Sequence, residues 1–319
     1  MTERYFVTGG TGSLGSKLVK HLLATTDDIV VCYSRDPHKQ NRLLTETNNN
    51  PNLRCVIGDI RDKDRLWWWM RGATAVAHCA ALKHVDIGEY NSSEYESTNI
   101  VGSRNVMETA VKLGVQKAII ISSDKSVAAA NLYGRTKAVA ERSWIRFNTE
   151  ARGKTLLSAL RYGNVFDSQG NVVQVWRDRL QKGLPIIVRE PDPTRFICFL
   201  RWGVKWIIDV LACMRGGEVF VPCNLRTLSI HTLARQFSPE DQWQRLPLGS
   251  GEKQHEVLLS PEEIPDTVTV GHFWVVNPLD HQWKYEKRVG APVDVSQVSS
   301  ATAPRMPVGE FLVQLEEKG

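Results

Sequence analysis

The feature that most constrains the fold is a regular alternation of short β-branched runs and amphipathic stretches through the first half of the chain. The short runs cover residues 5–8, 29–33, 54–57, 75–78, 117–122 and 155–161. Stretches with helical spacing of apolar residues follow them at residues 16–24, 39–46, 63–71, 99–113 and 133–148. Strands that alternate with helices in this way form a parallel, doubly wound sheet with helices on both faces.

A glycine-rich turn follows the first predicted strand. It reads Thr8-Gly9-Gly10-Thr11-Gly12-Ser13-Leu14-Gly15 and leads directly into a predicted helix. Glycines at such a place permit a tight turn and let a dinucleotide pyrophosphate approach the backbone N–H groups at the positive end of the helix. A structural glycine turn is the alternative, but the position at the start of a βαβ pattern favours a dinucleotide site.

The alternation weakens after Tyr162, where loop signals increase and two separate helical patterns follow at residues 204–214 and 231–236. The sequence therefore predicts an α/β fold, a Rossmann-type doubly wound parallel sheet with a smaller α/β C-terminal substrate domain. We expect residues 1–165 to form the dinucleotide-binding domain, with a contribution from residues 200–225. Residues 166–319 form a discontinuous substrate-binding domain, in which residues 292–307 are expected to be a surface linker before a last helix at 308–317.

The end of the second predicted strand indicates which dinucleotide binds. Arg35 lies twenty positions after Gly15, where an NAD site usually has an acidic residue, and Ser34 and Lys39 accompany it. A guanidinium with a neighbouring hydroxyl and ammonium suits a 2′-phosphate, so we expect NADP. The alternative is that Arg35 and Lys39 are solvated charges and that Asp36 contacts the ribose instead.

The ends of the third and fourth predicted strands add further candidates for cofactor contact. Asp59 and Ile60 close the third strand, where a carboxylate can accept from the adenine amino group, although a turn aspartate is possible. Ala80 and Ala81 follow the fourth strand, and their small size lets the cofactor lie close. His78 and Cys79 resemble a metal pair, but no second cluster completes it, so we expect no metal.

The overall charge narrows the classes of partner. Forty Lys and Arg residues exceed thirty-five Asp and Glu residues by five, without a long basic run, so an anionic small ligand fits better than nucleic acid. We expect no nucleic-acid partner and no membrane span, because no run approaches the ~18 apolar residues that a span requires. Six cysteines without CxxC spacing indicate a reducing, cytoplasmic compartment.

The catalytic candidates lie after the fifth predicted strand. Ser123, Asp124 and Lys125 follow that strand, and Tyr133 and Lys137 begin the next helix. Tyr133 and Lys137 are four residues apart and share one helix face, where the ammonium can lower the pKa of the phenol and make it a usable base. Ser123 can orient the phenol. Asn99, in the motif at residues 98–102, is expected to support Lys137.

Together with further motifs, these residues resemble the extended short-chain dehydrogenase/reductases. More narrowly, the chain is similar to the soluble UDP-N-acetylglucosamine 4,6-dehydratases, whose 5-inverting type opens pseudaminic acid biosynthesis. The resemblance is carried by residues 8–15, 33–36, 80–85, 89–91, 98–102, 123–125, 131–137, 161–165, 194–196, 216–222 and 251–256. The family pattern usually has a proline before the Asn-Leu-Tyr-Gly motif. This chain has Val127-Ala128-Ala129-Ala130 there.

The resemblance implies three linked steps on a nucleotide-linked sugar, with a tightly bound NADP that is regenerated in each turnover. Tyr133 takes the proton of the 4-hydroxyl while NADP⁺ accepts the hydride from carbon 4. Lys125 removes the proton on carbon 5, and Asp124 protonates the departing 6-hydroxyl. The hydride then returns to carbon 6. For Lys125 to act as a base, burial near Lys137 and the cofactor would have to lower its pKa; a surface ion pair with Asp124 is the alternative.

The sugar diphosphate needs cations and an amide donor, and four residues are candidates for these roles. They are Lys83, which we also expect near the cofactor, Asn164, Arg195 and Lys253. For Lys253, a solvated lysine is equally acceptable. Three consecutive tryptophans, Trp67, Trp68 and Trp69, point in three directions on a helix, so at least one must be exposed or held by a partner. A subunit contact in a homo-oligomer is our hypothesis.

Two alternatives to the dehydratase stay open from the sequence. One is a nucleotide-sugar epimerase or ketoreductase of the same superfamily, which would not need Asp124 and Lys125 together. The other is a non-catalytic NADP-binding regulatory protein that kept the fold and lost turnover.

Overall fold

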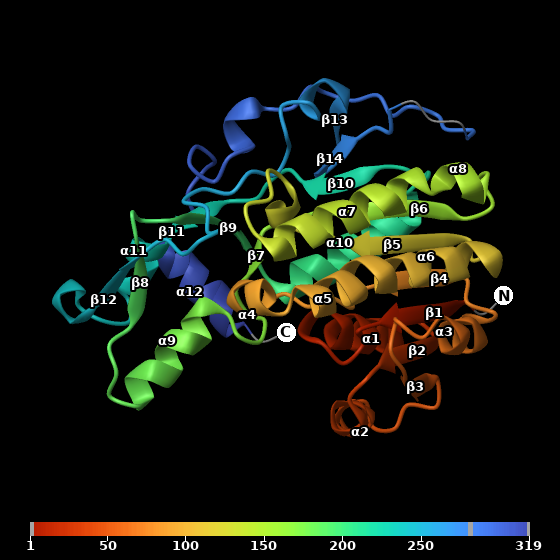
Figure 1. Ribbon diagram of the computed structural model, residues 1–319, viewed down its shortest axis with the longest axis horizontal. Helices are drawn as coiled ribbons and strands as arrows, with labels where there is room; N and C mark the ends of the chain where they lie inside the picture. The colour runs from red at the N-terminus through yellow and green to blue at the C-terminus, as the bar shows by residue number, and fades with distance from the viewer. Residues whose placement is uncertain (1–2, 280–282, 318–319) are drawn as a thin grey trace.

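The computed structural model describes residues 3–279 and 283–317, and its largest element is a nine-stranded sheet (Figure 1). In spatial order the strands are β3 (Leu53–Ile57), β2 (Ile29–Ser34), β1 (Arg4–Thr8), β4 (Ala75–His78), β5 (Lys117–Ile121), β6 (Leu156–Leu160), β10 (Val219–Pro222), β14 (Phe273–Val276) and β13 (Thr267–Val270). Neighbouring strands from β3 to β10 pair in parallel, and β14 pairs antiparallel with both β10 and β13. The predicted parallel sheet is confirmed. The antiparallel edge was not predicted.

Two layers of helices cover this sheet. One layer contains α1 (Ser13–Thr25), α2 (Pro37–Glu46) and α10 (Leu200–Cys213); the other contains α3 (Lys63–Met70), α6 (Ser103–Lys112) and α7 (Leu132–Arg146). Figure 1 shows α6 and α7 in front of the strands, with α10 behind them. Short helices α4 (Val85–Tyr90), α5 (Ser92–Tyr95) and α8 (Asn148–Ala151) and the π-helix η1 (Glu96–Gly102) complete this region. Right-handed crossovers between parallel strands place α1 and α2 on one face and α3, α6 and α7 on the other. The connection from β6 to β10 departs from this rule, because α10 packs against α1.

Side-chain caps fix where several of these helices begin. The Asp36 carboxylate accepts from the backbone N–H groups of His38 and Lys39 at the start of α2. Asn131 does the same for α7, accepting from Gly134 N at 2.7 Å. Such caps satisfy backbone donors that have no partner inside the helix. The Asn131 cap also sets the point from which Tyr133 projects.

The later part of the chain forms a second apolar core beside the carboxyl ends of the strands. Its elements are β7 (Asn164–Val165), α9 (Val172–Gln181), β8 (Ile187–Glu190), β9 (Thr194–Cys198), β11 (Thr227–Ser229), α11 (Ile230–Ala234), β12 (Gln244–Pro247) and α12 (Val308–Glu316). Trp176, Phe199 and Phe311 are almost completely buried in this core. In Figure 1 these elements lie together on the side away from the N-terminus. The domain boundary near residue 165 stays a prediction. β10 is a strand of the nine-stranded sheet and α10 packs on that sheet, although both come later in the chain.

Residues 292–307 are not the surface linker that their composition suggested. Ser300 is fully buried, and its hydroxyl lies 2.8 Å from the Thr194 hydroxyl of β9. Val298 and Ala303 belong to the main core. This segment therefore joins the two apolar cores before α12.

Candidate active site

The glycine turn brings the start of α1 against the ends of β1 and β4. Gly9 has a φ of +65°, and a Cβ there would lie 2.8 Å from the Ala80 Cα. A Cβ on Gly15 would lie 2.2 Å from the Gly9 carbonyl oxygen. Only glycine fits at either position. The N-terminus of α1 is thereby exposed to a ligand at the carboxyl end of the sheet, as an anionic pyrophosphate requires.

A cleft runs from this turn across the carboxyl ends of β1 to β4. Its walls contain ten of the predicted cofactor residues, which are Gly9, Thr11, Gly12, Ser34, Arg35, Lys39, Asp59, Ile60, Ala80 and Ala81. Tyr33, Asp36, Gly58, Cys79 and Thr98 complete the lining. A crevice outside the carboxyl ends of parallel strands is where doubly wound folds bind their ligands.

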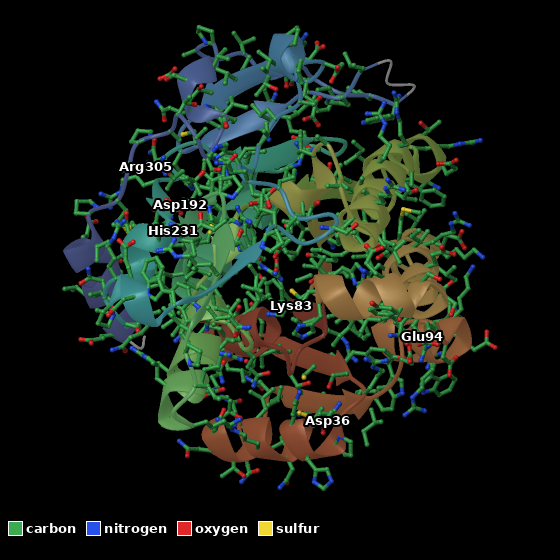
Figure 2. All side chains as sticks on the ribbon, turned by 60° about the vertical axis from the view of Figure 1, so that its left-hand side comes forward. Asp36, Lys83, Glu94, Asp192, His231 and Arg305 are labelled. Atoms are coloured by element: carbon green, nitrogen blue, oxygen red, sulfur yellow. The ribbon has the colours of Figure 1, made fainter. Side chains whose placement is uncertain are left out.

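Other predicted cofactor residues lie beside the cleft. The Ser13 hydroxyl accepts from Gln169 N at 3.1 Å, and Lys83 Nζ donates to the Gln169 carbonyl at 2.8 Å. Leu14 packs close to Gly203 of α10. Figure 2 shows Lys83 near the centre of the molecule, away from Asp36 at α2 and from Asp192 and His231. Lys83 and Ser13 thus connect the glycine turn to the loop that follows β7.

At the far end of the cleft, the acidic side chains have close partners, whereas two basic side chains lie farther from theirs. One Asp36 oxygen is engaged in capping α2, and its other oxygen lies 3.9 Å from Lys39 Nζ. Arg61 holds the Asp59 carboxylate through several hydrogen bonds, the shortest 2.7 Å, whereas Arg35 lies 3.9 Å from it. The side chains of Arg35 and Lys39 are about half exposed. This leaves two cations available to an anionic group.

Asn99 joins the loop after β4 to helix α7. Its amide binds the backbone of Leu82 in both directions, at 2.8 and 3.0 Å, and donates to the Thr136 hydroxyl at 3.0 Å. The Lys137 ammonium instead donates to the Ile121 carbonyl at the end of β5. Asn99 thus fixes the loop after β4 against α7, beside Lys137, and its support of Lys137 stays a prediction.

Asp124 and Lys125 lie in a short 3-10 turn, η2 (Asp124–Ser126), directly after β5. Leaving the strand lets consecutive side chains meet, and Lys125 Nζ lies 3.2 Å from Asp124 Oδ1. The Ser123 hydroxyl caps the turn by accepting from Lys125 N at 3.3 Å and donates to the same Asp124 oxygen at 2.9 Å. Asp124 is completely buried, and its Oδ2 has no hydrogen-bond partner among the described residues.

Burial and two neighbouring carboxylates set the pKa values of Asp124 and Lys125. Burial raises the pKa of Asp124, a shift that Lys125 opposes and Glu256 increases. Burial alone would lower the pKa of Lys125, but the carboxylates of Asp124 and Glu256 outweigh it, so this pKa is raised. In the protein without substrate and cofactor Lys125 is therefore an ammonium, and the lowering expected beside the bound cofactor stays a prediction.

Tyr133 and Lys137 share one face of α7, as their spacing predicted. Burial raises the pKa of the Tyr133 phenol, although Lys125 and Ser123 favour the phenolate. Burial lowers the pKa of Lys137 to about 8, against the opposing effects of Glu141 and Cys79. Lys125, in the η2 turn that we call the catalytic turn, is the cation that favours the phenolate most, and the expected role of Lys137 stays a prediction.

Three predicted substrate residues lie around the catalytic turn. Asn164 Oδ1 accepts from Lys125 Nζ at 3.0 Å. Arg195 donates to the backbone carbonyls of Thr194 and Gln254 at 2.8 and 3.0 Å. Lys253 is not a solvated lysine, because its ammonium lies 2.8 Å from a Glu256 oxygen and donates to the Val127 carbonyl.

Sequence reasoning missed Glu256, whose carboxylate lies between Lys125 and Lys253. It is 2% exposed, and its Oε1 lies 3.5 Å from Lys125 Nζ. The Gly-Glu-Lys-Gln-His-Glu motif at residues 251–256 contained the signal, but nothing local showed that its last residue reaches the turn after β5.

His78 is a buried structural residue at the end of β4. Its two ring nitrogens lie 2.6 Å from the Thr8 hydroxyl and 2.8 Å from the Ser103 hydroxyl, and burial lowers its pKa to about 3. Within residues 3–279 and 283–317, no group of three His, Cys, Asp or Glu side chains could hold a metal ion. No helix in the same residues is long and apolar enough to cross a membrane.

Comparison with known proteins places the chain among nucleotide-sugar enzymes. The family described as polysaccharide biosynthesis proteins matches residues 5–278. UDP-N-acetylglucosamine 4,6-dehydratase (inverting) of Campylobacter jejuni subsp. jejuni serotype O:23/36 (strain 81-176) is 37% identical over 86% of this chain and 83% of that protein. UDP-glucose 4-epimerase of Rickettsia felis is 30% identical over 97% of this chain and 95% of its own length. The X-ray structure of Pen from Bacillus thuringiensis has a TM-score of 0.87 and 26% identity, covering 99% of this chain and 98% of Pen.

Proposed function

Because this chain belongs to the family described as polysaccharide biosynthesis proteins, we propose that it is a nucleotide-sugar 4,6-dehydratase. Its substrate is UDP-N-acetylglucosamine, and its product is a UDP-4-keto-6-deoxy-hexosamine with carbon 5 inverted. The similarity to the inverting dehydratase over most of both chains supports this assignment. The observation that carries it is the contact between Asp124 and Lys125 beside Tyr133, since an acid and a base on neighbouring sugar carbons are what dehydration needs.

The cofactor we propose is NADP. The glycine turn, the exposed N-terminus of α1 and the cleft across β1 to β4 fit a dinucleotide. Arg35 and Lys39 suit a 2′-phosphate, and the engagement of Asp36 in capping α2 argues against a ribose contact there. When bound, the cofactor supplies the hydride acceptor for carbon 4 and the hydride donor for carbon 6.

The chain's own residues move the protons. Tyr133 takes the proton of the 4-hydroxyl, helped by Lys125 and Ser123, which favour its phenolate form. The resulting ketone acidifies the proton on carbon 5, which the Lys125 amine removes. Asp124 donates its proton to the 6-hydroxyl, which leaves as water. After the hydride returns to carbon 6, carbon 5 takes up a proton on the opposite face, which gives the inverted product. We also propose that Tyr133 and Lys137, near the start of α7, contact the cofactor.

One proton transfer prepares the acid and the base together. In the protein without substrate, Lys125 is an ammonium 3.2 Å from the buried carboxylate of Asp124. Moving one proton across this contact breaks an N–H bond and forms an O–H bond, with no change in total charge. The products are the neutral amine and the carboxylic acid that the reaction uses. Burial of Asp124, which raises its pKa, favours this exchange, and the raised pKa of Lys125 opposes it until the substrate is bound.

For the sugar diphosphate we propose Arg195 and Lys83, with Asn164 near the reacting carbons. Arg195 lies close enough to Lys125 and Glu256 to affect the pKa of both, so it borders the catalytic turn. Lys83 lies on the loop after β4, facing the loop after β7. Two cations at the edge of the site would hold the charge of a diphosphate.

We also propose that the enzyme is a homo-oligomer. Trp67 and Trp68 on α3 are 43% and 57% exposed, which confirms that the three tryptophans do not all face one core. Trp69 packs against the main core. Two large exposed indoles on one short helix are typical of a surface that a partner covers.

Substitutions in the catalytic turn test the proposed function. Asp124→Asn and Lys125→Met should each abolish formation of the 6-deoxy product from UDP-N-acetylglucosamine, followed by the new methyl signal in proton NMR. Tyr133→Phe should also remove turnover while NADP binding is kept. If cells with Tyr133→Phe cannot be distinguished from cells with the wild type, a non-catalytic regulatory protein is favoured over the dehydratase.

A UDP-sugar 4-epimerase is the second candidate, because the Rickettsia felis epimerase aligns with 97% of this chain. An epimerase needs Tyr133 but has no departing hydroxyl to protonate and no carbon-5 proton to remove. Interconversion of UDP-N-acetylglucosamine with its 4-epimer that survives both Asp124→Asn and Lys125→Met would select this candidate and reject the dehydratase.

A further inference from the structure

A segment from the later part of the chain crosses the loop that follows the catalytic turn. We call residues 251–256 the strap. The Asn131 amide donates to the Gly251 carbonyl at 2.9 Å, and Lys253 Nζ donates to the Val127 carbonyl at 2.9 Å. Both contacts join residues more than a hundred positions apart in the sequence. The strap therefore fixes the loop from outside.

The loop beneath the strap has little to hold its own conformation. It contains three consecutive alanines, Ala128, Ala129 and Ala130, and Ala128 has a φ of +46°. The left-handed region disfavours residues that carry a Cβ. Since no proline restricts this loop, contacts from the strap must keep it in place above the turn.

At its end, the strap delivers a buried carboxylate to the catalytic turn. Glu256 Oε1 lies 3.5 Å from Lys125 Nζ, and Glu256 Oε2 lies 2.8 Å from Lys253 Nζ. The Lys125 ammonium donates hydrogen bonds to Asp124 and Asn164 at 3.2 and 3.0 Å, and Glu256 adds an ion pair from a third segment. Partners on three segments restrict both the position and the direction of a flexible lysine side chain.

The proposed reaction gives this arrangement a purpose. A buried carboxylate is unfavourable unless it is paired, and Lys253 alone already pairs Glu256. Its second oxygen nevertheless faces Lys125, the base that must reach carbon 5. Asp124 cannot hold Lys125 throughout turnover, because it becomes the protonated acid. A second carboxylate that keeps its charge can do so.

We propose that Glu256 is a positioning residue, which holds the Lys125 amine beside the substrate while Lys253 anchors Glu256 to the loop that follows the catalytic turn. This inference rests on the proposed dehydratase function, in which Lys125 is the carbon-5 base. The charged or titratable groups that face Lys125 are Asp124, Glu256, Arg195 and Tyr133. Of these, Glu256 and Asp124 favour the ammonium and Arg195 opposes it. The loss of Glu256 therefore leaves Asp124 as the one carboxylate among them that favours the ammonium.

The test measures Lys125 itself, in the protein without sugar nucleotide. The protein is labelled with ¹³C-lysine, and the Lys125 signal is assigned by its absence from Lys125→Met. Titration of that signal by NMR should give a pKa lower by at least about one unit in Glu256→Gln than in the wild type, because a carboxylate within 4 to 6 Å shifts a pKa by about 1–3 units. An unchanged Lys125 pKa overturns the proposal.

A matched control comes from the same strap. Glu252 is also a carboxylate, but it pairs with Arg189 at 3.0 Å and accepts from Gly249 N at 2.7 Å. Glu252→Gln should leave the Lys125 pKa unchanged. An equal fall in both variants would mean that the strap acts only through its folding. If Glu256→Gln does not fold, Glu256→Asp keeps the charge with a shorter side chain and should give a smaller fall; no fall then overturns the proposal.

Kinetics separate positioning from a general loss of structure. With UDP-N-acetylglucosamine, Glu256→Gln should lower kcat by about 10- to 100-fold at nearly constant KM, since Lys125 is misplaced while the nucleotide contacts remain. The acid limb of its pH profile should move to lower pH, and Glu256→Asp should recover part of kcat. A rise in KM with unchanged kcat contradicts the proposal. If UDP-N-acetylglucosamine is not converted by the wild type, the proposed function fails, and the Lys125 titration still decides the position of Glu256.

Discussion

Replacing Lys137 with methionine should stabilise the cofactor-free protein while abolishing turnover. Lys137 is 5% exposed, and burial lowers its pKa from 10.5 to about 8. A fall of that size corresponds to about 3 kcal/mol, at about 1.4 kcal/mol for each pKa unit, which is the cost of keeping the buried ammonium charged. Methionine has a similar shape but loses the hydrogen bond from the charged ammonium to the Ile121 carbonyl, worth about 2 kcal/mol. The expected gain at pH 7 is about 1 kcal/mol.

The dependence on pH distinguishes this cause from better packing. Between pH 8 and 10.5 an unfolded lysine binds more protons than Lys137 in the folded protein, so the wild type gains stability as the pH rises. The advantage of Lys137→Met is therefore complete below pH 8 and is lost toward pH 10.5.

Urea unfolding followed by tryptophan fluorescence at pH 7 and pH 10 measures this difference. Lys117→Met is the matched control, because Lys117 is half-buried and also donates to a backbone carbonyl, that of Leu211 at 2.7 Å. The control should show no gain. If Lys137→Met is less stable than the wild type at pH 7, or if its gain persists at pH 10, the reasoning is refuted.

Further predictions concern the cofactor, the core and the assembly. Arg35→Ala should weaken NADP binding by about tenfold or more, and NAD binding little, in calorimetry; equal losses would contradict a 2′-phosphate contact. Asp36→Ala should lower the free energy of unfolding by about 1 kcal/mol through the lost cap, with NADP affinity unchanged; weaker NADP binding would return the ribose contact to Asp36. Glu141→Gln should cost about 2 kcal/mol in urea unfolding, because the buried Arg161 guanidinium pairs with Glu141 and Glu263 and would keep only Glu263; a cost below about 1 kcal/mol would contradict this. Replacing Trp67 and Trp68 with serine should reduce the mass in light scattering to one chain of 36.0 kDa. A wild type that is already monomeric would rule out the oligomer.

The sequence predicted the first half of the fold well because local patterns determine it. The strands from β1 to β6 are short, mostly apolar runs, and each long helix has an apolar face of regular spacing. The glycine turn and the Tyr133–Lys137 spacing are likewise short-range features. Their environment in the sheet follows once the alternation is recognised.

The remainder of the site depends on contacts between distant segments. Glu256 reaches Lys125 from more than a hundred residues away, and Ser300 reaches Thr194 across a similar separation. Composition misled where burial was decided by such contacts, as in residues 292–307. The raised pKa of Lys125 depends on the same kind of contact, because the strap provides the second carboxylate beside it.

The most direct test of the central claim is proton NMR of the purified protein with UDP-N-acetylglucosamine in deuterated water, without added reductant. The account predicts a new methyl signal from carbon 6 and deuterium at carbon 5, because a residue of the site exchanges its proton with solvent and returns it. Ring coupling constants should show inversion at carbon 5. If NADP binds but no methyl signal forms, or if the sugar changes only at carbon 4, the assignment of Asp124 and Lys125 as the acid and base of a dehydratase is contradicted.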